Sequence, residues 1–298
     1  MLEVVISDLK LENPVILASG ILGSKWSSLA KVAEFSGAIV AKSVGLNSRE
    51  GYKNPVVLNQ ECGIVNAVGL ASPGAKEFSK ELEKLFKVTN KPLIVSLFAQ
   101  SSEEFSSLPN YFPFASAFEL NLSCPHAEKL GMAIGVDEKA VKDCIKAVKE
   151  VTDKPVFAKL TPNVTDITKI GIAAEKGGAD AVVAVNTFKA ISIDVVSRKP
   201  VLSNVKGGLS GKAIKPLALR CVWDLYEVLD IPIIGCGGIS NWKDVVEFIL
   251  AGAIAVQVGS AFYESYRAVE GIVKGLNDYL SYTGEKIEEL VGLAHGGV

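Results

Sequence analysis

Residues 231–260 read IPIIGCGGISNWKDVVEFILAGAIAVQVGS, and two short apolar runs in this segment flank an amphipathic stretch. The runs cover residues 231–235 and 253–258, and neither alternates apolar with polar residues. Strands of this kind lie in parallel sheets that are buried on both faces. The stretch 242–250 between them has the spacing of a helix. The segment therefore predicts a strand–helix–strand unit with parallel strands.

The same kinds of strand start recur along the chain. A proline followed by an apolar run occurs at residues 91–95, 154–158 and 231–235, and Gly-Ala followed by an apolar run occurs at 37–41, 178–182 and 252–256. A proline at the first residue of a strand removes no ladder hydrogen bond. The glycines follow helix-like stretches, where a left-handed C-cap is expected. The repetition predicts that strands and helices alternate along the whole chain.

The expected architecture is an α/β fold, a (β/α)8 TIM barrel with an N-terminal β-hairpin and long loops at its C-terminal face, in one domain over 1–298. The hairpin is expected from Val4–Ser7 and Lys10–Leu11. An open doubly wound sheet is the alternative, but its phosphate-binding glycine loop follows the first strand. Here the glycine-rich turns follow the last two strands. The eight strands are expected near residues 14–18, 38–42, 93–98, 116–121, 155–160, 180–186, 231–235 and 253–258, with helices that include 138–151, 165–176 and 242–250.

Composition excludes several classes of protein. The 298 residues carry 31 basic and 33 acidic side chains, a net charge of −2, which does not favour a nucleic-acid partner. The apolar runs are too short to span a bilayer, and early charges such as Glu3 and Asp8 do not fit a signal peptide. The five cysteines include no C-x-x-C pair, so no metal or iron–sulfur site is expected. The chain is expected to be a reduced, cytoplasmic protein without a membrane partner.

Long segments follow the second, fourth and sixth expected strands, at Val44–Gly74, Leu122–Val136 and Thr187–Leu209. Loops of this length in a compact domain are usually functional, and in a barrel they leave from the catalytic face. The turns Gly235–Gly238 and Gly259–Ser260 follow the seventh and eighth strands, where barrels of this type bind phosphate. Both a phosphosugar and flavin mononucleotide (FMN) satisfy such a site.

Polar residues at strand ends supply the remaining candidates. Lys42 and Lys159 lie at equivalent ends, where an ammonium in a partly desolvated pocket would stabilise an anion. Asn66, Asn121 and Asn186 suit a planar amide or imide ring. Cys124 opens a long loop and would act as a base if its surroundings favour the thiolate. A packing cysteine or a Cys/His nucleophilic dyad with His126 are the alternatives, although no acyl-transfer motif accompanies the pair.

Five motifs at the expected strand ends and loops can be compared with known families. They are Asn121-Leu-Ser-Cys-Pro-His126, Asn66-Ala-Val-Gly-Leu70, Lys159-Leu-Thr-Pro-Asn-Val-Thr-Asp166, Gly207-Gly-Leu-Ser-Gly211 and Ile233-Ile-Gly-Cys-Gly-Gly238. Together they resemble the motifs of the dihydroorotate dehydrogenases. The resemblance runs from about Leu9 to about Phe262. The Arg198-Lys-Pro segment and the missing membrane-binding helix are most like the soluble class 1B branch.

The resemblance implies FMN-dependent oxidation of dihydroorotate to orotate in pyrimidine (UMP) biosynthesis. Cys124 would take the proton from C5 of the substrate while hydride passes from C6 to flavin N5. The substrate would contact Lys42, Asn66, Val68, Gly69, Leu70, Asn121, Asn186 and Thr187. FMN would contact Ala18, Gly20, Lys42, Ser43, Asn121, Lys159, Val185, Gly211, Gly237, Gly238, Gly259 and Ser260.

Two residues depart from the pattern. His126 and Leu97 each stand where an asparagine is common, and both resemble the pyrimidine-reducing barrel of dihydropyrimidine dehydrogenase. A reductase of that kind is therefore one alternative, although the 66–70 loop favours a substrate with a carboxylate. A phosphosugar isomerase or aldolase that uses Lys159 as a Schiff base, and a non-catalytic barrel, are the others.

Class 1B relatives also imply a partner and an assembly. They pass electrons to NAD through a separate iron–sulfur flavoprotein subunit, and relatives are commonly homodimers or heterotetramers. Fumarate, a quinone or another acceptor remains open from the sequence alone.

Overall fold

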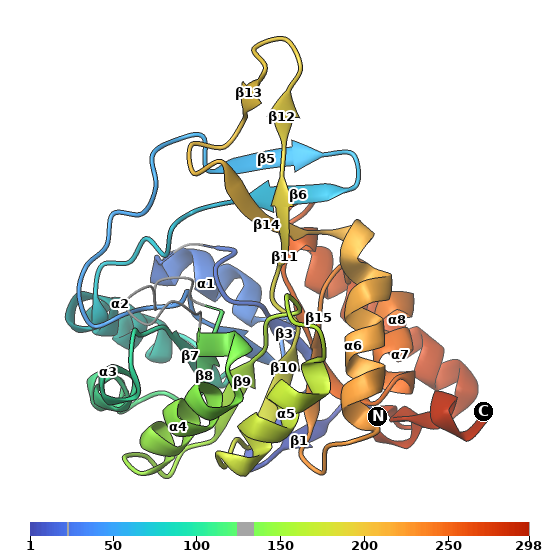
Figure 1. Ribbon diagram of the computed structural model, residues 1–298. Coiled ribbons are helices and arrows are strands. Elements are labelled where there is room, and N and C mark those ends of the chain that lie inside the picture. The colour runs from blue at the N-terminus through green and yellow to red at the C-terminus, as the bar shows by residue number, and fades with distance from the viewer. Residues whose placement is uncertain (23, 124–133, 298) are drawn as a thin grey trace.

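Eight parallel strands close into a barrel in the computed structural model, which describes residues 1–22, 24–123 and 134–297 (Figure 1). All eight strands expected from the sequence are confirmed to within a few residues. In the order in which they pair around the barrel they are β3 (Val15–Leu17), β4 (Ala38–Val40), β7 (Leu93–Leu97), β8 (Ala117–Asn121), β9 (Val156–Lys159), β10 (Ala181–Ala184), β15 (Ile233–Cys236) and β16 (Ala253–Val258).

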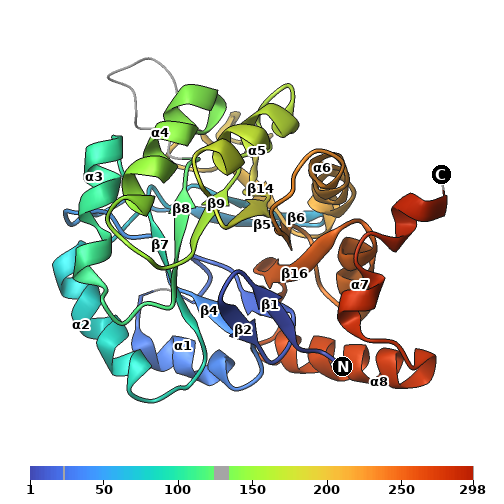
Figure 2. The same cartoon turned by 90° about the horizontal axis from the view of Figure 1, so that it is seen from below.

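Helices surround the barrel, as the alternating pattern predicted (Figure 2). Every residue of β7 and β9 is buried, which explains why these runs are apolar on both faces. The helices are α1 (Trp26–Ala33), α2 (Ala75–Phe86), α3 (Ser102–Ser107), α4 (Glu138–Lys149), α5 (Ile167–Lys176), α6 (Lys215–Tyr226), α7 (Trp242–Leu250) and α8 (Ala268–Thr283). Short 3-10 helices cover Pro109–Tyr111, Ile134–Val136, Lys212–Ile214, Ser260–Tyr263, Ile287–Leu290 and Leu293–Gly297.

Helix α7 shows how local sequence positions the site. Asn241 caps its first turn, and the Asp244 carboxylate accepts hydrogen bonds from the backbone in return. Such a cap stabilises a helix by about 1 kcal/mol. The buried face of α7 presses Phe248 onto β15 so closely that a Cβ at Gly235 would lie 2.4 Å from the Phe248 ring. The cap and this packing fix the turn that runs from β15 into α7.

The expected N-terminal hairpin is present. Strands β1 (Val4–Ile6) and β2 (Leu9–Leu11) pair antiparallel, and Ile6 and Leu11 are buried. In the view from below the hairpin crosses the end of the barrel (Figure 2). It thereby covers the N-terminal ends of the strands, so the opposite end remains for a binding site.

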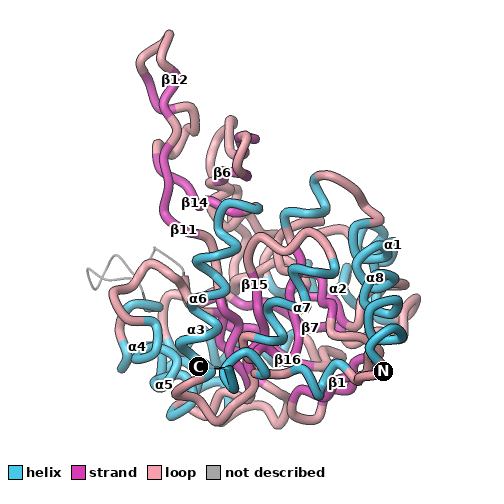
Figure 3. The backbone as a smooth tube through the Cα atoms, turned by 90° about the vertical axis from the view of Figure 1, so that its right-hand side faces the viewer, coloured by secondary structure: helices cyan, strands magenta, loops and turns pink. Residues whose placement is uncertain are grey.

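A second sheet lies over that opposite end, and its strands come from two of the long segments that were expected as loops. Strands β5 (Val57–Gln60), β6 (Gly63–Asn66), β11 (Phe188–Ile191) and β14 (Lys206–Ser210) form an antiparallel sheet in the order β11-β14-β6-β5. The segments after β4 and β10 thus complete one another. The short hairpin of β12 (Ile193–Asp194) and β13 (Lys199–Pro200) extends this sheet into an arm that projects from the molecule (Figure 3).

No helix in the described part of the chain is both long enough and apolar enough to cross a membrane.

Candidate active site

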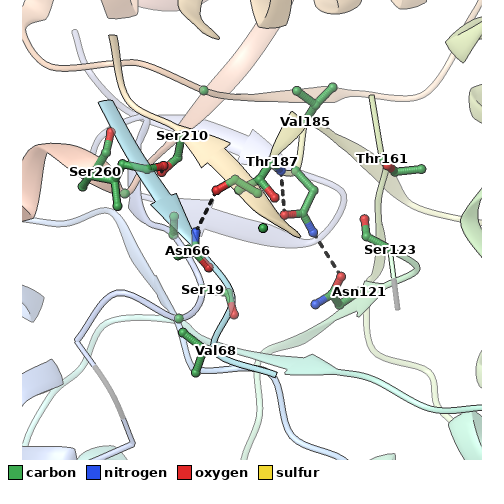
Figure 4. Close-up of a pocket in the computed structure, with 18 of the residues that line it drawn as sticks. Ser19, Asn66, Val68, Asn121, Ser123, Thr161, Val185, Thr187, Ser210 and Ser260 are labelled. Atoms are coloured by element: carbon green, nitrogen blue, oxygen red, sulfur yellow. Dashed lines mark hydrogen bonds between the residues drawn. The ribbon is translucent and has the colours of Figure 1, made fainter. Parts of the chain in front are cut away.

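A cavity of about 900 Å³ lies between the carboxyl ends of the barrel strands and the second sheet. Its wall combines residues from the ends of β8, β9, β15 and β16 with residues from β6 and β14 (Figure 4). The site residues expected from the sequence converge on this cavity. Those that line it are Ala18, Gly20, Lys42, Ser43, Asn66, Val68, Gly69, Leu70, Asn121, Lys159, Val185, Asn186, Thr187, Gly237, Gly238, Gly259 and Ser260.

Two expected residues are not in that wall. Gly211 lies behind it, where its carbonyl oxygen is 2.9 Å from the position that a Cβ on Gly238 would take. Cys124 lies outside the described residues, as does His126. Leu97 is fully buried in β7 and is not among the residues that line the cavity.

The turn after β15 has the features of an anion site. Gly238 has a φ of 73°, and a Cβ there would lie 2.8 Å from the Lys215 backbone nitrogen. The N–H groups of Gly237 and Gly238 have no acceptor among the described residues. The first N–H groups of α7, in contrast, already donate to the Asn241 side chain. The glycine amides, rather than the helix end itself, are therefore available to a phosphate.

A chain of hydrogen bonds orients the amide side chains. Asn186 donates from Nδ2 to Asn121 Oδ1 over 3.1 Å, and Asn121 donates from Nδ2 to Ser43 Oγ over 3.2 Å. The Thr187 N–H donates to Asn186 Oδ1 over 2.8 Å (Figure 4). Each amide therefore has a fixed donor and acceptor direction. Fixed amides of this kind can recognise a planar ring that carries both N–H and C=O groups.

Asn163, which the sequence reasoning missed, braces the same wall. Its Nδ2 donates to the Thr187 carbonyl over 3.0 Å, and its Oδ1 accepts from the Lys189 N–H over 2.8 Å. These bonds tie the β9 side of the barrel to the start of β11. Its position shortly after the end of a predicted strand was the sequence feature that could have identified Asn163 as a site residue.

The loop after β6 offers a second set of backbone donors. Gly69 and Leu70 both have positive φ, at 77° and 55°. The Val68 carbonyl accepts from the Tyr52 N–H over 3.1 Å, and the Gly69 carbonyl accepts from Arg49 Nε over 2.8 Å. The N–H groups of Gly69 and Leu70 have no acceptor among the described residues. Consecutive amides in this conformation form a concave site for an anionic group.

The two lysines differ in a way that the sequence did not reveal. Lys42 lines the cavity with no acceptor for its ammonium in the described part of the chain, and burial lowers its pKa. Burial also acts to lower the pKa of Lys159, but the Glu119 carboxylate outweighs it, and the pKa of Lys159 lies above its usual value. Lys42 is thus a partly buried cation of the wall that has no counter-ion among the described residues, whereas Lys189 and Lys206, which also line the cavity, are exposed.

Comparisons with known proteins identify the family of the chain. A family model described as dihydroorotate dehydrogenase matches residues 1–280. A protein of Methanocella arvoryzae is 50% identical over 288 residues, covering 96% of this chain and 95% of that relative. Proteins of Pyrococcus horikoshii and Pyrococcus furiosus are 50% and 51% identical, covering 99% and 95% of this chain and 98% and 95% of those relatives. All three relatives are named dihydroorotate dehydrogenase B (NAD(+)), catalytic subunit.

Proposed function

The chain belongs to the dihydroorotate dehydrogenase family, and on that premise we propose that it is an oxidoreductase that converts dihydroorotate to orotate in pyrimidine biosynthesis. One observation carries the proposal beyond family membership. A single cavity holds oriented amides, the two free amides of the Gly69–Leu70 loop and the Lys42 ammonium. A pyrimidine ring that bears a carboxylate matches these three features together.

The substrate carboxylate is the group that the 68–70 loop and Lys42 would hold. A charge-assisted hydrogen bond from a partly desolvated ammonium contributes about 1.5–3 kcal/mol. A pyrimidine without a carboxylate would leave these donors unpaired, which disfavours uracil as the substrate. Asn66, Asn121 and Asn186 would hold the ring.

The family is flavin-dependent, and we propose FMN in particular as the flavin that this cavity binds. The free amides of Gly237 and Gly238, with Gly259 and Ser260 across the corner, would hold its phosphate, and Lys159 would lie beside the ring system. When bound, the flavin supplies the acceptor for the hydride that leaves C6 of the substrate. Cys124, outside the described residues, is the proposed base that takes the proton from C5.

The phosphate site yields a test of its own. Gly238→Ala places a Cβ against backbone atoms at a φ that L-residues avoid, which costs about 1–2 kcal/mol unless the turn moves. We expect the Kd for FMN, measured by fluorescence titration of the flavin-free protein, to rise about 10-fold.

Gly271→Ala is the matched control, because a Cβ at Gly271 in α8 meets nothing within 4 Å. That variant should bind FMN as the parent does. Equal affinity in both variants would remove the turn at Gly238 from the cofactor site.

Anaerobic titration of the purified chain with dihydroorotate tests the proposed activity. Stoichiometric substrate should bleach the flavin absorbance, whereas dihydrouracil should not. A yellow protein that only dihydrouracil bleaches would be a pyrimidine reductase. A protein that is colourless and that FMN cannot reconstitute would contradict the proposal entirely.

The acceptor and the assembly extend the proposal. The relatives are named catalytic subunits of an NAD(+) enzyme, which supports electron transfer to NAD through a separate iron–sulfur flavoprotein subunit in a heterotetramer. NAD added to the bleached chain alone should therefore leave the flavin reduced. Rapid return of the yellow colour would show that this chain reduces NAD without a partner.

A further inference from the structure

Glu119 is a buried carboxylate to which neither the sequence motifs nor the proposed mechanism gives a role. It lies in the middle of β8 between Phe118 and Leu120, its side chain has no exposed surface, and it lines the cavity. An ionised carboxylate in such a place is unfavourable unless its partners compensate for the lost hydration.

Glu119 and its two partners, Gln257 and Lys159, form a network across the barrel. Lys159 Nζ donates to Gln257 Oε1 over 2.7 Å, and Gln257 Nε2 donates to Glu119 Oε2 over 2.5 Å. Lys159 Nζ and Glu119 Oε1 are 3.7 Å apart, and Glu119 Oε1 has no hydrogen bond among the described residues. The Gln257 amide therefore joins the ammonium to the carboxylate and fixes both.

Few other titratable groups face Lys159 within the described residues. Cys236 from β15 is one, and burial raises the pKa of its thiol, so the group is neutral near physiological pH. Lys42 lines the same cavity from the end of β4 but shares no hydrogen bond or ion pair with the network. Glu119 is thus the charge that opposes the effect of burial on Lys159.

We propose that Glu119 is a positioning residue for Lys159: through Gln257 it holds the ammonium charged and in place before the flavin is reduced. This inference rests on the proposed function, because it concerns the flavin of that reaction. A hydride brings two electrons and one proton, so the flavin ring gains one negative charge when it accepts the hydride. The permanent Lys159 cation compensates that charge, and no second proton has to enter from solvent.

The number of protons taken up on reduction tests the proposal. The dependence of the flavin midpoint potential on pH gives this number, and it can be measured with a chemical reductant, independently of dihydroorotate. Between about pH 7 and about pH 9 we expect one proton per two electrons in the parent protein, since the Lys159 ammonium remains charged there. Two protons per two electrons in the parent would overturn the proposal without any variant.

Glu119→Gln keeps the shape of the side chain and removes its charge. Burial then acts on Lys159 without a neighbouring carboxylate to offset it, so Lys159 should lose its proton more readily beside the oxidised flavin and should bind a proton on reduction. We expect the slope of potential against pH to double toward the alkaline end. Glu119→Asp, which retains the charge, should restore at least part of the single-proton behaviour.

Two further variants separate this role from a structural one. In Glu119→Gln combined with Lys159→Met the lysine amine that would bind the second proton is gone, so at the alkaline end, where the reduced flavin itself stays anionic, the slope should return to one proton per two electrons. Cys236→Ala changes packing at the same place without changing charge, and its slope should match the parent. A doubled slope that persists in the double variant would assign the proton to another group and overturn the inference.

Failure of the proposed function and failure of this inference give different experimental results. If dihydroorotate does not reduce the flavin but the proton counts follow this pattern, the network acts as inferred and the substrate is wrong. If dihydroorotate bleaches the flavin but Glu119→Gln leaves the slope unchanged, the activity stands and Glu119 has no such role.

Discussion

Cys124→Ser is expected to lower kcat with dihydroorotate about 10²- to 10⁴-fold near neutral pH while the flavin stays bound. A serine hydroxyl is a far weaker base than a thiolate. The ordinary pKa of a cysteine is about 8.5, and the base must be deprotonated, so turnover of the parent enzyme should rise with pH as thiolate forms. Stopped-flow reduction of the flavin by dihydroorotate across a pH series measures both effects.

Cys62→Ser serves as the control, because Cys62 is an exposed thiol that does not line the cavity. Its rate of flavin reduction and its pH profile should equal those of the parent. Unchanged reduction by Cys124→Ser at neutral pH would take Cys124 out of the role of base. Cys124 lies outside the described residues, so its proposed role as the base is tested by these kinetics.

The barrel could be predicted from the sequence because its strands are buried on both faces. Such strands appear as short apolar runs, and each run here begins or ends at a glycine, a proline or a polar residue. The N-terminal hairpin could also be predicted, because its two strands are neighbours in the sequence. That residues 1–298 form one domain stays a prediction.

The second sheet could not be predicted in the same way. Its central pairing joins Val65 to Leu209, two residues that are far apart in the sequence. Strand β14 contains Gly207 and Gly208, and glycine has a low preference for strands. The hairpin of β5 and β6 is local, but the sheet forms only when β14 of the distant segment pairs with β6. The sequence predicted that these segments lie at the cavity, but it did not predict that they pair into the sheet that covers it.

In the site, too, features that depend on neighbours in the sequence could be predicted, and features that depend on distant residues could not. Strand ends placed Lys42 and Lys159 at the cavity, but their difference arises from Glu119 and Gln257 on other strands. A charged residue inside an apolar run, as in Phe118-Glu119-Leu120, was a signal that pointed to a buried partner. Sequence alone does not say which cation that partner is.

Lys42→Ala is expected to raise the Kd of orotate or dihydroorotate about 10- to 100-fold, in line with the loss of one charge-assisted hydrogen bond. A carboxylate-free analogue such as uracil should lose less than about 3-fold, since it makes no such bond. Equilibrium titration of flavin absorbance or fluorescence with each ligand measures the difference. Lys189→Ala is the control, because Lys189 lines the same cavity as an exposed lysine, where solvent and salt screen its charge. Equal losses for both ligands would place Lys42 at the flavin rather than at the carboxylate.

The pH dependence of stability and of ligand binding in the parent protein tests the same lysine. Burial lowers the pKa of Lys42 in the free protein, so the folded chain releases this proton at a lower pH than the unfolded chain does. The unfolded state then binds more protons, and the contribution of Lys42 to stability is unfavourable at neutral pH and is relieved as pH rises toward about 10.4. A bound carboxylate favours the charged form of Lys42, so ligand binding should take up a proton at pH values above the lowered pKa, and the affinity for the ligand should fall as pH rises through that pKa.

Lys42→Met should therefore raise the Tm of the ligand-free protein near neutral pH and abolish this pH dependence of orotate binding. A lower Tm in that variant would mean that Lys42 has a stabilising partner and is not held ready for a substrate carboxylate.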